Sequence, residues 1–248
     1  MAAVTNELNL ANSIFPGLND ERGILICGYE WGFSQEDQRL FAEGNPAPFF
    51  DKDAETTFSN KTPAHGDRAL AWRYDKRIHR WFELWGHPLN REGLGGLFEK
   101  CIVQTNWCST EGHHIEGSYY AKLSDPVQVE NFLFHVSKLD PAVILLMGSA
   151  MIDVLPHPSI LPRFTGIVGA QTSPLQKVQK EFSGRRFRVG FQSFQRCSVV
   201  SLPHPSSSRG LSDNYIALFA NEIGDLISSV KRAKGVDSPN TSLQARRP

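Results

Sequence analysis

The segment ILICGYEWG, residues 24–32, determines the expected fold class because a short apolar run breaks abruptly into polar and aromatic residues. Four consecutive apolar residues followed by a glycine are typical of a buried parallel strand. The acid Glu30 then lies just beyond the carboxyl end of that strand. Ligands bind at this edge of open α/β sheets, so Glu30 is the first candidate for chemistry.

Comparable apolar runs recur along the chain, separated by segments in which apolar residues have helical spacing. The runs occupy residues 23–28, 101–105, 142–147 and 198–202. The helical segments occupy residues 75–85, 126–139, 149–155 and 214–231. This alternation predicts an α/β fold, a three-layer α/β/α sandwich with a mainly parallel central sheet. Residues 180–197 alternate around a Ser-Gly turn, which predicts a β-hairpin.

The length and composition indicate one domain and a short tail. A chain of 248 residues with 40% hydrophobic content can bury a sizeable core, and we expect the domain to cover residues 1–233. Residues 234–248 lack apolar periodicity and are expected to form a disordered tail. The polar segment 39–67 is too long for a plain connection and is expected to be a functional loop.

Charge, cysteine usage and apolar run length exclude several classes of protein. Lys and Arg together number 26, as do Asp and Glu, so a nucleic-acid site would have to be a local patch. The four cysteines lack the close pairs of a metal site or a small disulfide framework. The longest apolar runs are too short to span a membrane, and the first residues lack a signal-peptide pattern. We therefore expect a cytoplasmic monomer without a metal.

Polar residues follow the predicted strands at Glu30, Asn106 and His204, and Gly148 follows the remaining one. An acid, an amide and an imidazole on one rim of a sheet form a plausible catalytic group. A second Leu-Pro-His-Pro-Ser stretch contains His157. That histidine follows a helical segment rather than a strand, so we expect it to have a turn role.

Four motifs in order resemble the uracil-DNA glycosylase superfamily: GYEWG at the first strand, VQTNW at the second, the strand and glycine of VILLMGS, and LPHPSSSRG at the last. The resemblance extends over residues 23–228. It implies a monofunctional DNA glycosylase that flips a pyrimidine and hydrolyses its N-glycosidic bond, leaving an abasic site. DNA would be the partner, and no cofactor would be needed.

The resemblance also implies roles for the residues at the strand ends. Glu30 would activate water and face the cationic sugar, while His204 would donate a hydrogen bond to the departing base. Asn106 would read the pyrimidine edge. The alternatives are an acid that caps a turn, an ordinary loop histidine and a buried turn residue.

The resemblance places aromatic and small residues around the base. Phe58 matches the stacking position best, although Phe49 and Phe50 of the same loop are alternatives. Gly32 stands where uracil-specific members carry a tyrosine, so it should leave space beside position five of the pyrimidine. Trp31 either lines that space or packs against the sheet.

The loop after His204 is expected to enter the DNA duplex. Ser206 belongs to this loop, and either Arg209 or Leu211 would fill the position that the flipped base leaves. Other basic residues could contact phosphates, although we expect about half of them to be solvated surface charges. They are Lys61, Arg68, Arg73, Lys76, Arg77, Arg80, Arg185, Arg186 and Arg188.

Gly32 and the long loop favour a bulky pyrimidine modified at position five, such as the glucosylated hydroxymethylcytosine of phage DNA. The protein would then be an anti-phage enzyme. Two alternatives stay open: a repair glycosylase for uracil or another deaminated base, and a noncatalytic DNA-binding protein on the same fold.

Overall fold

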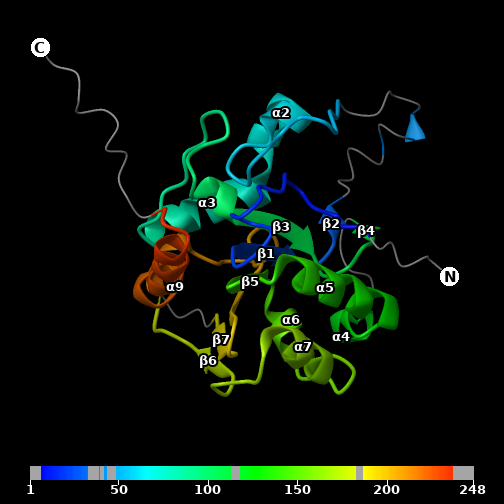
Figure 1. Ribbon diagram of the computed structural model, residues 1–248, viewed down its shortest axis with the longest axis vertical. Coiled ribbons are helices and arrows are strands. Elements are labelled where there is room, and N and C mark those ends of the chain that lie inside the picture. The colour runs from blue at the N-terminus through cyan, green and yellow to red at the C-terminus, as the bar shows by residue number, and fades with distance from the viewer. Residues whose placement is uncertain are drawn as a thin grey trace, which may run out of the picture.

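The computed structural model describes residues 7–32, 39, 42–43, 49–112, 118–182 and 187–236. At its centre is a six-stranded sheet in the order β3-β1-β5-β8-β7-β6 (Figure 1). The strands are β1 (Ile24–Gly28), β3 (Ile102–Asn106), β5 (Val143–Met147), β6 (Gln176–Val178), β7 (Val189–Ser193) and β8 (Ser198–Leu202). Strands β1, β3, β5 and β8 are parallel to their neighbours among themselves, whereas β7 is antiparallel to β8 and β6 is antiparallel to β7. The predicted α/β fold with a mainly parallel central sheet is confirmed.

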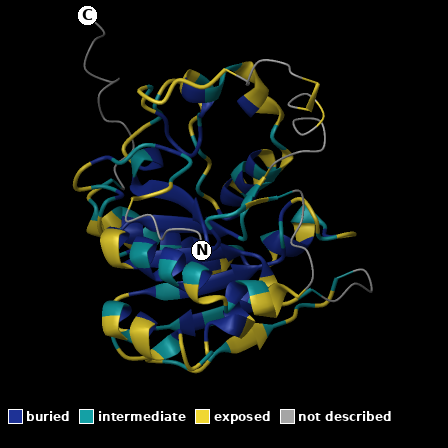
Figure 2. Ribbon diagram, turned by 90° about the vertical axis from the view of Figure 1, so that its right-hand side faces the viewer, coloured by how far each residue is buried: buried dark blue, intermediate teal, exposed yellow. Residues whose placement is uncertain are grey.

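Helices cover both faces of the sheet. One layer contains α3 (Arg73–Leu84), α8 (Asp213–Ala217) and α9 (Ala220–Ala233), and the other contains α5 (Pro126–Leu139), α6 (Ser149–Val154) and α7 (Leu161–Val168). Strand β1 alternates between the two cores, with Leu25 and Cys27 on the α5 side and Ile24 and Ile26 on the α3 side. Figure 2 shows the buried strands between helices whose outer turns are exposed.

Two predicted elements differ from those observed. The helix expected over residues 214–231 is divided into α8 and α9, which are separated by Leu218 and Phe219. The first arm of the hairpin lies at β6, earlier in the chain than Phe182, and residues 183–186 lie outside the described residues.

Short elements complete the fold around the sheet. The strands β2 (Trp31–Gly32) and β4 (Glu111–Gly112) form a separate parallel pair. The short helices are α2 (Thr62–His65), α4 (Tyr119–Leu123), and the 3-10 turns η1 (Asp67–Ala71) and η2 (Glu99–Cys101). The described part of the long loop therefore contains α2, whereas residues 40–41 and 44–48 lie outside the description.

The register of the parallel strands brings their carboxyl ends to one level. Gly28 lies opposite Asn106, and Met147 lies opposite Leu202. Because Cys27 pairs with Leu146, the two pairs lie at the same height across the sheet. The residues that follow β1, β3, β5 and β8 therefore meet at one edge.

The ordered chain continues slightly beyond the expected domain boundary. Lys234 Nζ donates hydrogen bonds to the carbonyls of Gly17 at 2.8 Å and Glu21 at 2.6 Å, and Val236 packs against the core. Residues 237–248 of the expected tail lie outside the described residues. In the described ranges, no helix is long and apolar enough to cross a membrane. All four cysteines are buried free thiols.

Candidate active site

The His204 imidazole has a defined tautomer. Its Nδ1 accepts hydrogen bonds from the backbone N–H groups of Ser206 and Ser207, each at 3.2 Å. A backbone N–H can only donate, so Nδ1 carries no proton and the ring proton lies on Nε2. Burial lowers the pKa of His204 to about 4. The ring is therefore neutral at physiological pH, with its Nε2–H as the remaining donor.

Tyr29 fixes the orientation of that imidazole. The two rings are stacked with centroids 5.8 Å apart and planes at 7°. The Tyr29 hydroxyl accepts a hydrogen bond from the Ala150 N–H at 3.0 Å, at the start of α6. Gly148 makes room for this arrangement, because a Cβ at that position would lie 2.2 Å from the Tyr29 ring.

Asn106 is the last residue of β3, and its side chain packs closely against Gly28. It is 5% exposed, and its Oδ1 would lie 2.2 Å from a Cβ on Gly28, which explains the glycine at the end of β1. Asn131 Nδ2 donates to the carbonyls of Asn106 at 3.1 Å and Trp107 at 2.9 Å, which holds the backbone there. Within the described part of the chain, the Asn106 carboxamide makes no hydrogen bond of its own, so it is available to a ligand.

Glu30 is held through one of its two carboxylate oxygens. Its side chain is 6% exposed, and Oε2 accepts a hydrogen bond from Thr110 Oγ1 at 3.0 Å and forms an ion pair with Lys122 Nζ. The other oxygen, Oε1, is buried and has no hydrogen-bond partner among the described residues. Oε1 is therefore a fixed acceptor that could receive a hydrogen bond from a water molecule.

No sequence pattern indicates a role for Lys122 or Thr110. Lys122 lies on α4, a five-residue helix too short to show apolar periodicity, and Thr110 lies in the turn before β4. Their role depends on the pairing of β2 with β4, which brings residues about 80 positions apart into contact.

Arg77 of α3 clamps the loop that carries His204. It forms an ion pair with Asp213 at 2.7 Å and donates hydrogen bonds to the carbonyls of Pro205 at 2.8 Å and Leu211. Arg77 is one of the basic residues that could contact phosphates, but its guanidinium is occupied within the protein. Its position instead fixes both ends of the loop.

The same loop separates the two wedge candidates. Ser206 and Arg209 are exposed, whereas Leu211 is 7% exposed and packs in the core on the α3 side. Leu211 is therefore a wrong assignment for a wedge in this structure, because its side chain contributes to the core. Arg209 stays the candidate, and Ser206 contributes the N–H that His204 accepts.

Phe58 does not offer an open face to a base. It is 1% exposed, Lys61 Nζ lies 4.9 Å from the ring centroid, and the His79 ring meets it edge-on at 5.1 Å. Lys61 itself forms a buried ion pair with Asp75 at 2.7 Å, so it does not stand ready for a phosphate either. The expected stacking role of Phe58 is corrected by its burial under Lys61 and His79, and the phosphate contact suggested for Lys61 is corrected by its ion pair with Asp75. The alternatives Phe49 and Phe50 are 63% and 60% exposed.

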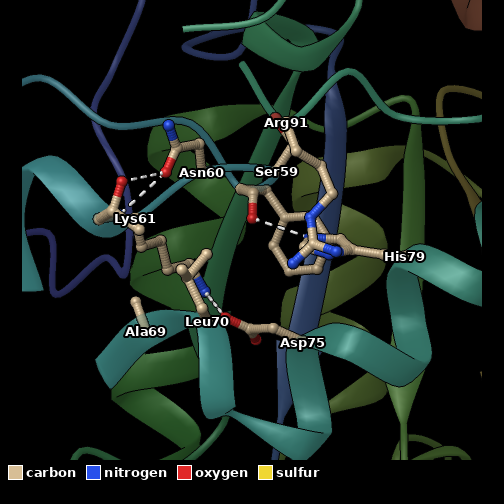
Figure 3. Close-up of a pocket in the computed structure, with 10 residues that line it drawn as sticks. Ser59, Asn60, Lys61, Ala69, Leu70, Asp75, His79 and Arg91 are labelled. Carbon is tan, nitrogen blue, oxygen red and sulfur yellow. Dashed lines mark hydrogen bonds and ion pairs between the residues drawn. The ribbon is translucent and has the colours of Figure 1, made fainter. Parts of the chain in front are cut away.

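A small hollow lies beside Phe58 and Lys61 (Figure 3). His79 lines it, donating from Nε2 to the Phe58 carbonyl at 3.3 Å, while Nδ1 has no partner among the described residues. Burial lowers the pKa of His79 to about 4. The hollow has room for about one water molecule, which would satisfy Nδ1. The hollow is thus too small for a base.

Trp31 and Gly32 lie on β2. The Trp31 N–H donates to the Thr110 carbonyl at 3.1 Å, and the residue is half-buried. Gly32 is exposed, and a Cβ there would meet no described atom within 4 Å. The described residues therefore leave open space beside Gly32, and its role beside a pyrimidine stays a prediction.

His157 and His204 share a local arrangement in which the imidazole Nδ1 accepts from the backbone N–H of the serine two residues later. Its Nδ1 lies 2.7 Å from Ser159 Oγ and accepts from the Ser159 N–H at 3.3 Å. The turn follows α6, and the ring lies 5.9 Å from that of Tyr120. His157 therefore has the turn role that we expected.

Comparison with known proteins adds no further assignment. No protein-family model matches the chain, and no curated protein matches it. In the part of the chain that the structure describes, no three His, Cys, Asp or Glu side chains gather in a metal-binding group.

Proposed function

We propose that this protein is a monofunctional DNA glycosylase that hydrolyses the N-glycosidic bond of a flipped pyrimidine. The observation that carries the proposal is that two residues, each of which follows a strand at the same edge of the sheet, keep an unused polar atom. His204 is neutral and retains its Nε2–H donor, while Glu30 has a fixed carboxylate with one unused oxygen. Breaking a glycosidic bond needs a donor for the leaving group and an acceptor for water.

Each group has one role in the reaction. As the bond breaks, its electron pair goes to the base, and the Nε2–H of His204 donates to the base oxygen that gains negative charge. The carboxylate of Glu30 stabilises the cationic sugar and accepts a proton from the water that adds to the sugar carbon. Asn106 forms hydrogen bonds with the pyrimidine edge.

Lys122 and Thr110 act through Glu30. They hold Oε2, and therefore Oε1 is the oxygen left for the attacking water. A carboxylate with one oriented oxygen loses less freedom in the transition state than a mobile one. Both are positioning residues in this proposal.

The substrate that we propose is a bulky pyrimidine modified at position five, such as the glucosylated hydroxymethylcytosine of phage DNA. A Cβ at Gly32 would meet no atom of the described residues within 4 Å, which supports this choice. Replacing Gly32→Tyr should reduce cleavage of the bulky substrate at least tenfold while sparing any cleavage of uracil. Equal loss on both substrates would argue against Gly32 as the determinant of base size.

The test is an excision assay on matched DNAs that carry uracil, hydroxymethylcytosine or glucosylated hydroxymethylcytosine. Released base and abasic sites are measured for the wild type and for Glu30→Gln, which we expect to be about 10²–10⁴-fold slower. Glu111→Gln is the matched control, since Glu111 is an exposed acid on the adjacent β4.

The three substrates separate the alternatives. Cleavage of uracil alone would indicate a repair glycosylase. Binding of DNA without cleavage of any substrate, unchanged in Glu30→Gln, would indicate a noncatalytic DNA-binding protein and contradict the proposal.

A further inference from the structure

Tyr74, in the first turn of α3, lies between the two groups proposed to hold the base. Its ring centroid lies 5.6 Å from that of His204. Its hydroxyl lies 3.2 Å from the position of a Cβ on Gly28, the same position that lies 2.2 Å from Asn106 Oδ1. Tyr74 therefore borders both His204 and Asn106, although no sequence motif includes it.

The Tyr74 hydroxyl is buried and has no hydrogen-bond partner among the described residues. Buried polar groups in native proteins are nearly always paired, so an exception needs an explanation. Two other buried or half-buried tyrosines follow the rule. The Tyr29 hydroxyl accepts from the Ala150 N–H, and the Tyr215 hydroxyl donates to the Phe187 carbonyl.

The hydroxyl can donate as well as accept. Burial, together with the charge of the adjacent Asp75, raises the pKa of Tyr74 well above its ordinary value. The phenol therefore stays protonated. The unused groups at this place are one phenol and one carboxamide, both of which suit the polar edge of a pyrimidine.

We propose that Tyr74 is a base-contacting residue whose hydroxyl forms a hydrogen bond with the flipped pyrimidine. This inference rests on the proposed function, and it assigns to Tyr74 a hydrogen bond rather than the stacking contact that the sequence suggested for Phe58. Phe58 is covered by Lys61 and His79, whereas Tyr74 adjoins the two residues that would contact the base.

The test is Tyr74→Phe, which removes the hydroxyl and keeps the ring. Because the hydroxyl has no partner in the free protein, the melting temperature should stay the same or rise. The KM for the cleaved DNA should rise about tenfold, the effect of one lost hydrogen bond. Tyr215→Phe is the matched control: it removes a paired hydroxyl, so it should lower the melting temperature and leave KM unchanged.

A second measurement does not depend on cleavage. Free uracil and free 5-hydroxymethylcytosine are titrated into protein carrying ¹³C-labelled tyrosine, with Tyr74→Phe used to assign the Tyr74 resonance. We expect that resonance to shift with at least one of the two bases.

The outcomes separate this inference from the proposed function. Cleavage by the wild type with an unchanged KM in Tyr74→Phe would overturn the inference and leave the function intact. A shifted Tyr74 resonance without cleavage of any DNA would support the contact and contradict the function. Neither cleavage nor a shift would overturn both.

Discussion

Tyr29 and His204 stack on one another although they follow strands that are not neighbours. Tyr29 follows β1 and His204 follows β8, and β5 lies between these strands in the sheet. The rings can meet because β5 is followed by Gly148, whose missing side chain leaves the space that the Tyr29 ring occupies. The orientation of the imidazole therefore depends on residues that follow three different strands, β1, β5 and β8.

Gly148→Ala should disrupt this stacking. The new Cβ would lie 2.2 Å from the Tyr29 ring, so the ring must move and release His204. We expect base excision to fall at least tenfold, because misplacing a catalytic group by a small distance is costly. Gly166→Ala, where a Cβ meets nothing within 4 Å, is the control and should keep full activity in the same excision assay.

Arg77→Lys should loosen the loop that carries His204. Lysine keeps the charge but cannot hold Asp213 and the two carbonyls of Pro205 and Leu211 with one planar group. We expect kcat to fall about tenfold or more, with faster amide hydrogen exchange over residues 204–211. Arg80→Lys, at an exposed pair with Glu83, should change neither quantity. Unchanged exchange in Arg77→Lys would show that the clamp is dispensable.

Stability should fall as the pH drops below about 6.5. Burial lowers the pKa values of His79 and His204 to about 4, whereas the unfolded chain binds these protons near pH 6.5. Between pH 6.5 and pH 4 the unfolded state therefore binds more protons, and the free energy of unfolding decreases with falling pH. Each histidine should contribute on the order of 2 kcal/mol. Urea unfolding at pH 7.5, 5.5 and 4.5 measures the slope.

His79→Gln supplies the check on that pH dependence. The glutamine amide can still donate to the Phe58 carbonyl but does not titrate, so the loss of stability between pH 7.5 and pH 4.5 should become smaller. A slope identical to that of the wild type would mean that His79 is protonated normally in the folded protein.

Lys61→Met should destabilise the fold strongly. It leaves Asp75 buried without its charged partner, and breaking such a pair costs about 3–5 kcal/mol. The double substitution Lys61→Met with Asp75→Leu should recover much of that loss, since no unpaired charge is left buried. Arg163→Met, which removes an exposed pair with Glu130, should cost less than about 1 kcal/mol. Urea unfolding of the four proteins decides the matter.

The sheet could be predicted because its strands are apolar on both sides. A run such as residues 142–147 is too short for a membrane span and has too many branched aliphatic residues for a surface element. Asn106 and His204 could be placed at the edge for the same reason, since each follows such a run by one or two residues. The register that makes these ends level is visible only in the structure.

The remainder of the site depends on contacts that leave no local pattern. Lys122 pairs with Glu30 across 92 positions, from a helix of five residues. Phe58 follows the expected motif, but its face is covered by Lys61, whose own burial depends on Asp75 in α3. Tyr74 lies on a helix identified by its apolar spacing, and nothing in that spacing indicates that its hydroxyl lacks a partner.

The level strand ends have a consequence for synthesis of the protein on the ribosome. Glu30 and Asn106 emerge early, but the imidazole arrives only with β8, which must enter the sheet between β5 and β7. A nascent or truncated chain that ends before this strand presents an acid and an amide without the imidazole. An incompletely folded chain would therefore lack the proposed activity, and the cell's own DNA would be exposed to it only once folding is complete.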